Sequence, residues 1–238
     1  MARTKMTRHQ LKEKDEITTS LRRFTEFVYG RQKEIIIGVA VLVVLALGFI
    51  GWNIYASSRN ASGQTQLSAA IATFNDTTNI KNDKERYEKT MVEAQKTMDS
   101  YRSLPVGMIA QYYLALSQEG LGDTAKAVQN LQEVIQRGDA KVKGVAQFAL
   151  AAIHRKHGEP QKAIELYKQL YDVGGYSRAA AAYELAVLYE GNNQIDQAKD
   201  YYQKLATEFP DSPFRQEVDE ALKRLGVTLP PPTAQKPS

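Results

Sequence analysis

The stretch AQFALAAIHRKHGEPQKAIELYKQLY (Ala146–Tyr171) decides the fold, because two other stretches repeat its pattern. One is AQYYLALSQEGLGDTAKAVQNLQEVI (Ala110–Ile135), and the other is AYELAVLYEGNNQIDQAKDYYQKLATEFP (Ala182–Pro210). The three align without a gap inside any unit, at offsets of 36 and 35 residues. A fixed period of this size is typical of proteins built from stacked structural repeats.

The matched positions carry residues that suit a pair of antiparallel helices. The equivalent sets are Leu114-Ala115, Leu150-Ala151 and Leu185-Ala186; Gly122, Gly158 and Asn193; Ala127, Ala163 and Ala198; Leu131, Tyr167 and Tyr202; and Val134, Leu170 and Leu205. A small alanine in each helix lets two backbones approach, and the larger apolar residue one turn on fills the groove beside it. Gly and Asn tolerate the positive φ at which many helices stop. Because apolar residues recur at helical period and nothing alternates like a strand, we predict an all-α fold.

Degenerate helices are predicted on both sides of the three clear pairs. QLSAAIATF and residues 86–104 read as an irregular first pair with a long loop, 75–84, between them. At the other end, residues 212–226 predict a helix with Ser212 as N-cap, Pro213 at its first position and Gly226 as its stop. Terminal units of such stacks are usually atypical, because one face meets water. Residues 229–238, LPPPTAQKPS, predict a disordered, proline-rich tail.

The arrangement of alanine, glycine and aromatic residues over 107–210 resembles the tetratricopeptide repeat, including Pro210 where that family often ends a unit. The first helix of each pair lines a concave face in that family, so the resemblance implies an apolar groove that binds a partner. The groove residues it implies are Ile109, Tyr112, Leu116, Val145, Phe148, Tyr183 and Val187. An aromatic ladder of this kind suits peptide or protein recognition. The alternative is that these side chains pack against neighbouring helices or the C-terminal helix.

The stretch EIIIGVAVLVVLALGFIGW, residues 34–52, is long enough to cross a membrane. From Ile35 to Trp52 it has 18 consecutive residues without a charge, and a spanning helix needs roughly 17 to 25 apolar residues. We therefore predict a transmembrane helix at 35–55, followed by a polar stretch, 57–66, that is either a spacer or a continuation of the helix. A signal peptide cleaved near residues 56–58 is the alternative, but the length of the run and the 34 residues before it favour a retained anchor.

Charge predicts the direction of this anchor and the class of partner. Nine of the 31 Lys and Arg and five of the 27 Asp and Glu lie in residues 1–34, which therefore carry the whole net charge of +4. Because Lys and Arg stay on the cytoplasmic side, we expect a cytoplasmic basic arm at 1–34 and an exported domain at 56–228. Residues 56–238 hold 22 basic and 22 acidic side chains. Such an evenly charged domain has no nucleic-acid footprint, so nucleic acid is not an expected partner.

No set of residues predicts catalysis. His154 and His157 could face one metal ion with Glu159 nearby, but two histidines without a third placed ligand make a weak pattern. The sequence has no phosphate-binding loop and no Ser-His-Asp set, and the absence of cysteine excludes thiol chemistry. We expect a protein that is not an enzyme and has no cofactor or metal. An enzyme or metal protein that uses the two histidines is the least favoured hypothesis.

A basic arm, one retained span with the entry RQKEIIIGVAVLVVLALGFIGW and an exported repeat domain together resemble a bacterial family, the YfgM-like ancillary subunits of the SecYEG translocon. The resemblance implies a single-pass inner-membrane protein with a cytoplasmic N-terminus and a periplasmic scaffold. The partners it implies are translocon subunits, a periplasmic chaperone or peptidyl-prolyl isomerase, exported clients and membrane lipid. A membrane-tethered repeat adaptor in envelope assembly or cell division is the alternative, since its anchor and groove would look the same.

Overall fold

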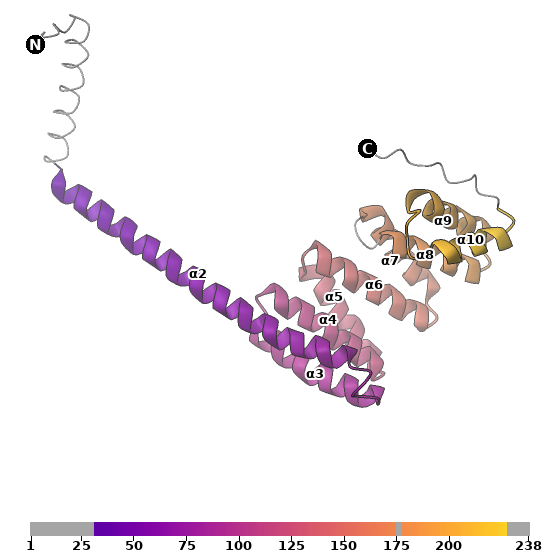
Figure 1. Ribbon diagram of the computed structural model, residues 1–238, viewed down its shortest axis with the longest axis horizontal. Coiled ribbons are helices and arrows are strands. Elements are labelled where there is room, and N and C mark those ends of the chain that lie inside the picture. Colours follow the sequence, from indigo (N-terminus) through magenta and orange to yellow (C-terminus); the bar gives the residue numbers. More distant parts are fainter. Residues whose placement is uncertain (1–30, 175–177, 228–238) are drawn as a thin grey trace, which may run out of the picture. The chain divides into compact units, whose positions relative to one another are not determined.

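The computed structural model describes residues 31–174 and 178–227, and all regular secondary structure in these ranges is helical. The helices are α2 (Gln32–Asn75), α3 (Asp83–Ser100), α4 (Pro105–Gly120), α5 (Thr124–Arg137), α6 (Ala140–Lys156), α7 (Pro160–Val173), α8 (Arg178–Gly191), α9 (Ile195–Glu208) and α10 (Arg215–Arg224) (Figure 1). The predicted all-α class is confirmed. Most of the predicted basic arm, 1–34, and the whole predicted tail, 229–238, lie outside the described residues.

The chain divides into two compact units, residues 1–59 and 60–238. Among the described residues, α2 holds one candidate span, Ala40–Asn75, that is long and apolar enough to cross a membrane. The first unit holds residues 32–59 of this helix. Its apolar side chains are exposed, from 51% for Ile50 to 72% for Phe49. The sequence left two alternatives for the polar stretch 57–66, a spacer or a continuation of the helix. The structure shows that this stretch is helical. The predicted limits of the span at residues 35 and 55 stay predictions, because α2 has no break at either one.

Three helix pairs, α4 with α5, α6 with α7 and α8 with α9, stack in chain order in the second unit (Figure 1). The turn inside each pair has a residue with positive φ: Gly122 at 85°, Gly158 at 75° and Asn193 at 59°. The same backbone hydrogen bond closes every turn, from the residue after this position to the carbonyl five residues back. The repeated glycine or asparagine is therefore explained by a local backbone requirement that few other residues meet.

The small and large apolar positions of the repeat form the core, as the alignment predicts. Ala127, Ala163 and Ala198 have no exposed surface, and the larger residues matched with them are also buried, with Leu131 and Tyr167 fully so. Each core cluster draws residues from more than one pair, since α4 contributes both to the cluster shared with α2 and α3 and to that shared with α5 and α6. The buried apolar residues therefore form three clusters, and neighbouring clusters share a helix, α4 or α6, which joins one pair to the next.

The flanking helices close both ends of the stack. Residues 60–75 of α2 and α3 pack on α4, where Leu67 and Ala70 are buried and the rings of Phe74 and Tyr113 meet edge to face at 5.3 Å. At the other end, α10 buries its apolar side against α8 and α9. The predicted start of α10 at Pro213 is wrong: the helix starts at Arg215, because the preceding residues form turns that end at Phe214.

Candidate functional site

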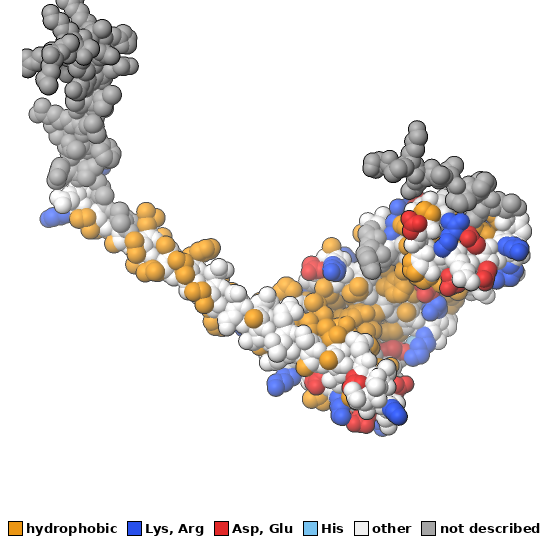
Figure 2. Space-filling view, viewed as in Figure 1, with side chains coloured by type: hydrophobic (Ala, Val, Ile, Leu, Met, Phe, Trp, Pro, Cys, Tyr) orange, Lys and Arg blue, Asp and Glu red, His pale blue; other side chains and the backbone are white. Residues whose placement is uncertain are grey.

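The seven predicted groove residues lie on the first helices of the three pairs. Three are on α4 and two each on α6 and α8, and every one keeps part of its side chain accessible, with Val145 39% exposed. Figure 2 shows hydrophobic side chains gathered over α4, α5 and α6. We name the set Ile109, Tyr112, Leu116, Val145 and Phe148 the apolar face. It is a surface of partly exposed, mostly large side chains on two helices that contact each other.

The apolar face is supported from beneath by the core. Ile109 and Tyr112 pack against the buried cluster of α4, α5 and α6, and the ring of Phe148 meets the fully buried ring of Tyr167 edge to face at 5.1 Å. Tyr112 also meets the neighbouring Tyr113 ring edge to face at 5.3 Å, and burial raises the pKa of the Tyr112 hydroxyl. These contacts fix the rings before any partner arrives, which lowers the entropy that binding would lose.

The third aromatic position has different surroundings. Tyr183 on α8 lies flat against Phe214, with ring centroids 4.5 Å apart and planes at 10°. This stacking covers one face of the Tyr183 ring with the residue that precedes α10. All three rings of the predicted ladder are partly exposed, and each contacts one other ring: Tyr112 meets Tyr113, Phe148 meets Tyr167 and Tyr183 meets Phe214.

The two candidate metal-binding histidines bind different carboxylates. His154 Nδ1 contacts Glu159 Oε2, whereas His157 Nε2 lies 3.0 Å from Glu119 Oε1 on the preceding pair. Among the described residues, no group of three His, Asp or Glu could hold a metal ion. The pair therefore serves as two separate polar contacts, and that of His157 joins one repeat to the next.

Glu119 is the centre of this junction between repeats. Its Oε1 accepts hydrogen bonds from Lys156 and His157, and its Oε2 accepts one from Thr124 at 2.8 Å. Burial alone would raise the pKa of the Glu119 carboxyl, but these three hydrogen bonds together hold it below its usual value. The carboxylate stays charged and ties the end of α4 to the end of α6.

The sequence did not predict a network of side-chain hydrogen bonds between α4 and α5. Gln111, only 2% exposed, donates to Asn130 Oδ1 at 3.0 Å and to Glu133 Oε2 at 2.7 Å, and Asn130 donates to Gln118 Oε1 at 2.8 Å. The alignment held a signal, since one repeat later Gln147 and Gln169 occupy the places of Gln111 and Glu133 and also hydrogen bond. Apolar periodicity does not detect such pairs.

Comparison with known proteins places this fold among repeat proteins. Residues 30–227 match the sequence model of the tetratricopeptide repeat-like domain, and no curated protein sequence matches the chain. Among solved structures, a Podosopora anserina putative kinesin light chain with nearly identical repeats is similar, at 19% identity and a TM-score of 0.54. The match covers 68% of this chain and 84% of that one. The protein MamA AMB-1 is similar at 12% identity and a TM-score of 0.48, over 72% of this chain and 84% of that one.

Proposed function

Because the chain belongs to the tetratricopeptide repeat-like domain family, we propose that it is a membrane-anchored scaffold for protein–protein interaction, an accessory subunit of the Sec translocon. In this role it holds a periplasmic chaperone or peptidyl-prolyl isomerase near chains that emerge from the translocon. The protein has no enzymatic activity of its own and needs no cofactor.

The observation that carries this proposal is the apolar face on α4 and α6. The core of this domain buries large side chains such as Leu131 and Tyr167 completely, as it does Ala127. Tyr112 and Val145, in contrast, remain partly accessible to solvent. Aromatic side chains such as tyrosine, fixed from below and accessible from above, are among the residues that contribute most to the binding energy of protein interfaces. The groove set that the repeat resemblance implies, including Tyr183 and Val187 on α8, is proposed as the binding surface.

Anchoring in the inner membrane rests on the first part of α2. Its exposed apolar residues, such as Leu42 at 66% and Phe49 at 72%, would be unfavourable in water, at roughly 25 cal/mol for each Å² of apolar surface. Trp52 and Tyr55, whose rings are 6.3 Å apart, stand where an aromatic belt would meet the headgroups. The excess of Lys and Arg before the span keeps the N-terminus in the cytoplasm and puts the repeats in the periplasm.

Site-specific photocrosslinking in intact cells tests the proposal. A photoreactive amino acid replaces Val145 on the apolar face, and in a separate strain it replaces Val173, which is 86% exposed at the end of α7. We expect position 145 to form adducts with a translocon subunit and with a periplasmic chaperone or isomerase, identified by mass spectrometry. Position 173 serves as the control for random collisions.

Two results would contradict the proposal. The apolar face is not a binding surface if positions 145 and 173 capture the same proteins in the same amounts. The translocon assignment fails if position 145 captures only proteins of envelope assembly or cell division, and that result would favour the adaptor hypothesis.

A further inference from the structure

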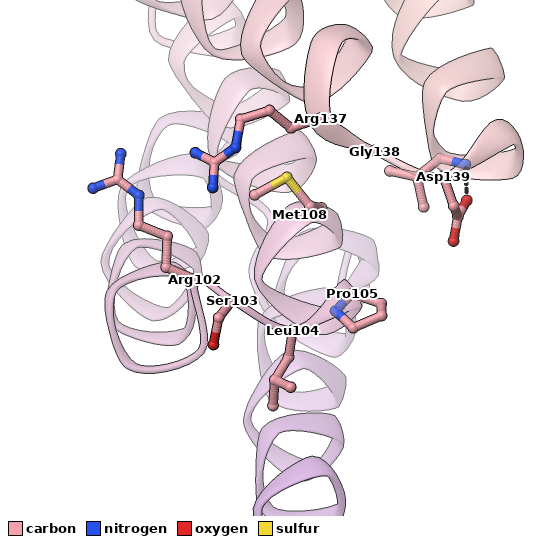
Figure 3. Close-up of a pocket in the computed structure, with 9 residues that line it drawn as sticks. Arg102, Ser103, Leu104, Pro105, Met108, Arg137, Gly138 and Asp139 are labelled. Atoms are coloured by element: carbon pink, nitrogen blue, oxygen red, sulfur yellow. Dashed lines mark hydrogen bonds between the residues drawn. The ribbon is translucent and has the colours of Figure 1, made fainter. Parts of the chain in front are cut away.

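A cavity of about 390 Å³ lies at the turns between consecutive pairs. Arg102 and Leu104, in the turn between α3 and α4, form part of its wall, and Arg137, at the end of α5, forms another part. Met108 and Val142, from the first turns of α4 and α6, add apolar surface. Figure 3 shows the guanidinium groups of Arg102 and Arg137 on the same side of the cavity, with Met108 beside them. The size is in the range of sites for small ligands or single side chains.

One carboxylate holds both arginines in place. Glu133 Oε1 lies 2.6 Å from Arg137 and 3.5 Å from Arg102, while its Oε2 accepts the hydrogen bond of the buried Gln111. The Gln111 hydrogen bond, followed by that of Arg137, holds the pKa of the Glu133 carboxyl below its usual value against the effect of burial. Asp139 also lines the cavity, so the two guanidinium groups and the carboxylates of Glu133 and Asp139 have a formal charge of about zero in total.

The wall of the cavity has more hydrogen-bond donors than acceptors that are free to pair with them. Asp139 Oδ1 accepts from the backbone N–H groups of Lys141 and Val142 at 3.0 and 2.9 Å, so this carboxylate caps the start of α6. Figure 3 shows a dashed line at the Asp139 carboxylate for one of these hydrogen bonds. A guanidinium has five N–H donors in a fixed fork, and Glu133 engages only some of those of Arg102 and Arg137. The side chains of the two arginines are 61% and 47% exposed, so their other donors can reach a ligand.

From this geometry we infer that the cavity binds the side-chain carboxylate of an acidic residue in a partner peptide, with an adjacent aliphatic side chain against Met108 and Val142. The inference rests on the proposed function, because it names the chemistry of a partner's segment. Arginine forks match carboxylate geometry with two parallel hydrogen bonds. Because Glu133 and Asp139 are already nearby, a partner carboxylate, at −1, adds less unfavourable negative charge than a phosphate, at about −2.

The test measures peptide binding to the full chain in detergent by fluorescence anisotropy. The probe is a dye-labelled, amidated peptide Gly-Ala-Glu-Leu-Ala-Gly, and its matched control has Gln in place of Glu. We expect the Glu peptide to bind at least about tenfold more tightly, equivalent to 1.4 kcal/mol. The Arg137→Gln variant should lose this preference, and Arg137→Lys should lose part of it because it keeps the charge without the fork.

Arg224→Gln is the control variant, because Arg224 is also exposed and paired with a glutamate, Glu190, which keeps a second partner in Tyr202. It removes the same charge from α10 and should leave peptide binding unchanged. Circular dichroism checks that each variant has the helical content of the parent.

Three results would overturn the inference: equal binding of the Glu and Gln peptides, an equal loss in Arg224→Gln and Arg137→Gln, or displacement of the Glu peptide by inorganic phosphate at lower concentration than by acetate. The proposed function is judged separately, through the adducts formed at Val145. If those adducts contain the expected partners while the peptides bind equally, the cavity inference fails and the scaffold proposal stands.

Discussion

Tyr167 and Tyr202 occupy equivalent repeat positions, but we expect loss of the hydroxyl group to change the stability of the domain differently at the two positions. Tyr202 donates to Glu190 Oε2 at 3.0 Å, whereas the buried hydroxyl of Tyr167 has no hydrogen-bond partner among the described residues. Both rings are core residues with at most 3% of their surface exposed. The substitutions Tyr167→Phe and Tyr202→Phe therefore each remove one oxygen atom from a buried ring, and the two positions differ in whether that oxygen has a hydrogen-bond partner.

The expected magnitudes follow from these contacts. A hydrogen bond to a charged group contributes roughly 1.5 to 3 kcal/mol, and Glu190 keeps the guanidinium of Arg224 at 2.7 Å after the change. We therefore expect Tyr202→Phe to lower the free energy of unfolding by about 1.5 kcal/mol, the lower end of that range. An unpaired buried hydroxyl disfavours the folded state by roughly 1 to 3 kcal/mol, so Tyr167→Phe should leave stability unchanged or raise it by about 1 kcal/mol.

Urea unfolding of the full chain in detergent, followed by circular dichroism, measures the difference. Stacked repeats need not unfold in one transition, so the midpoints of all variants are compared at one pH and one protein concentration. With a slope of about 2 kcal/mol per molar urea, the two variants should differ by roughly 1 M in midpoint. If Tyr167→Phe loses as much stability as Tyr202→Phe, the hydroxyl of Tyr167 is hydrogen bonded and the reasoning is wrong.

Three other substitutions test the repeat architecture by the same urea assay. Ala163→Leu overpacks the contact between helices and should destabilise by about 1 to 3 kcal/mol, while the exposed Ala125→Leu should change little; equal effects would contradict the packing argument. Gly122→Ala should destabilise by about 1 kcal/mol because φ is 85° there, whereas Gly191→Ala, with open space around its added methyl group, should not. The lowered pKa of Glu119 means that its contribution is present above its unfolded pKa and is lost as pH falls through the folded value. Glu119→Gln should therefore flatten the decline of the urea midpoint between about pH 5 and pH 3, and an unchanged decline would exclude this carboxyl as its source.

The helix pairs were predictable from sequence because their determinants are local. Ala127 acts through the helix it occupies, and Gly122 acts through the turn before that helix. Residues within each repeat therefore determine the structure of that repeat. The start of α10 was not predictable in this way. Its position depends on Phe214, which stacks on Tyr183 from the preceding pair, and a contact across 31 residues leaves no trace in local capping patterns.

The candidate site was predictable only in part, for the same reason. The repeat alignment identified Tyr112 and Phe148 because apolar residues recur there at a fixed offset. It overlooked Arg102 and Arg137, although they lie 35 residues apart, close to the repeat period. Charged residues at such positions usually face solvent, and only their common contact with Glu133 distinguishes them from other surface arginines.

Equivalent positions in a repeat acquire different roles according to their neighbours in the stack. Tyr183 has the same place in its helix as Tyr112 and Phe148, but it lies in the last pair and is stacked on Phe214 before α10. Val145 on α6 is 39% exposed, and α4 and α6 also contribute Met108 and Val142 to the cavity. Within the proposed binding surface, the first two pairs therefore hold the most exposed residue, Val145, and the cavity beside it, whereas on the third pair Tyr183 also contacts the residue before α10. A partner that uses both features would lay apolar side chains along the face and an acidic residue at the turns.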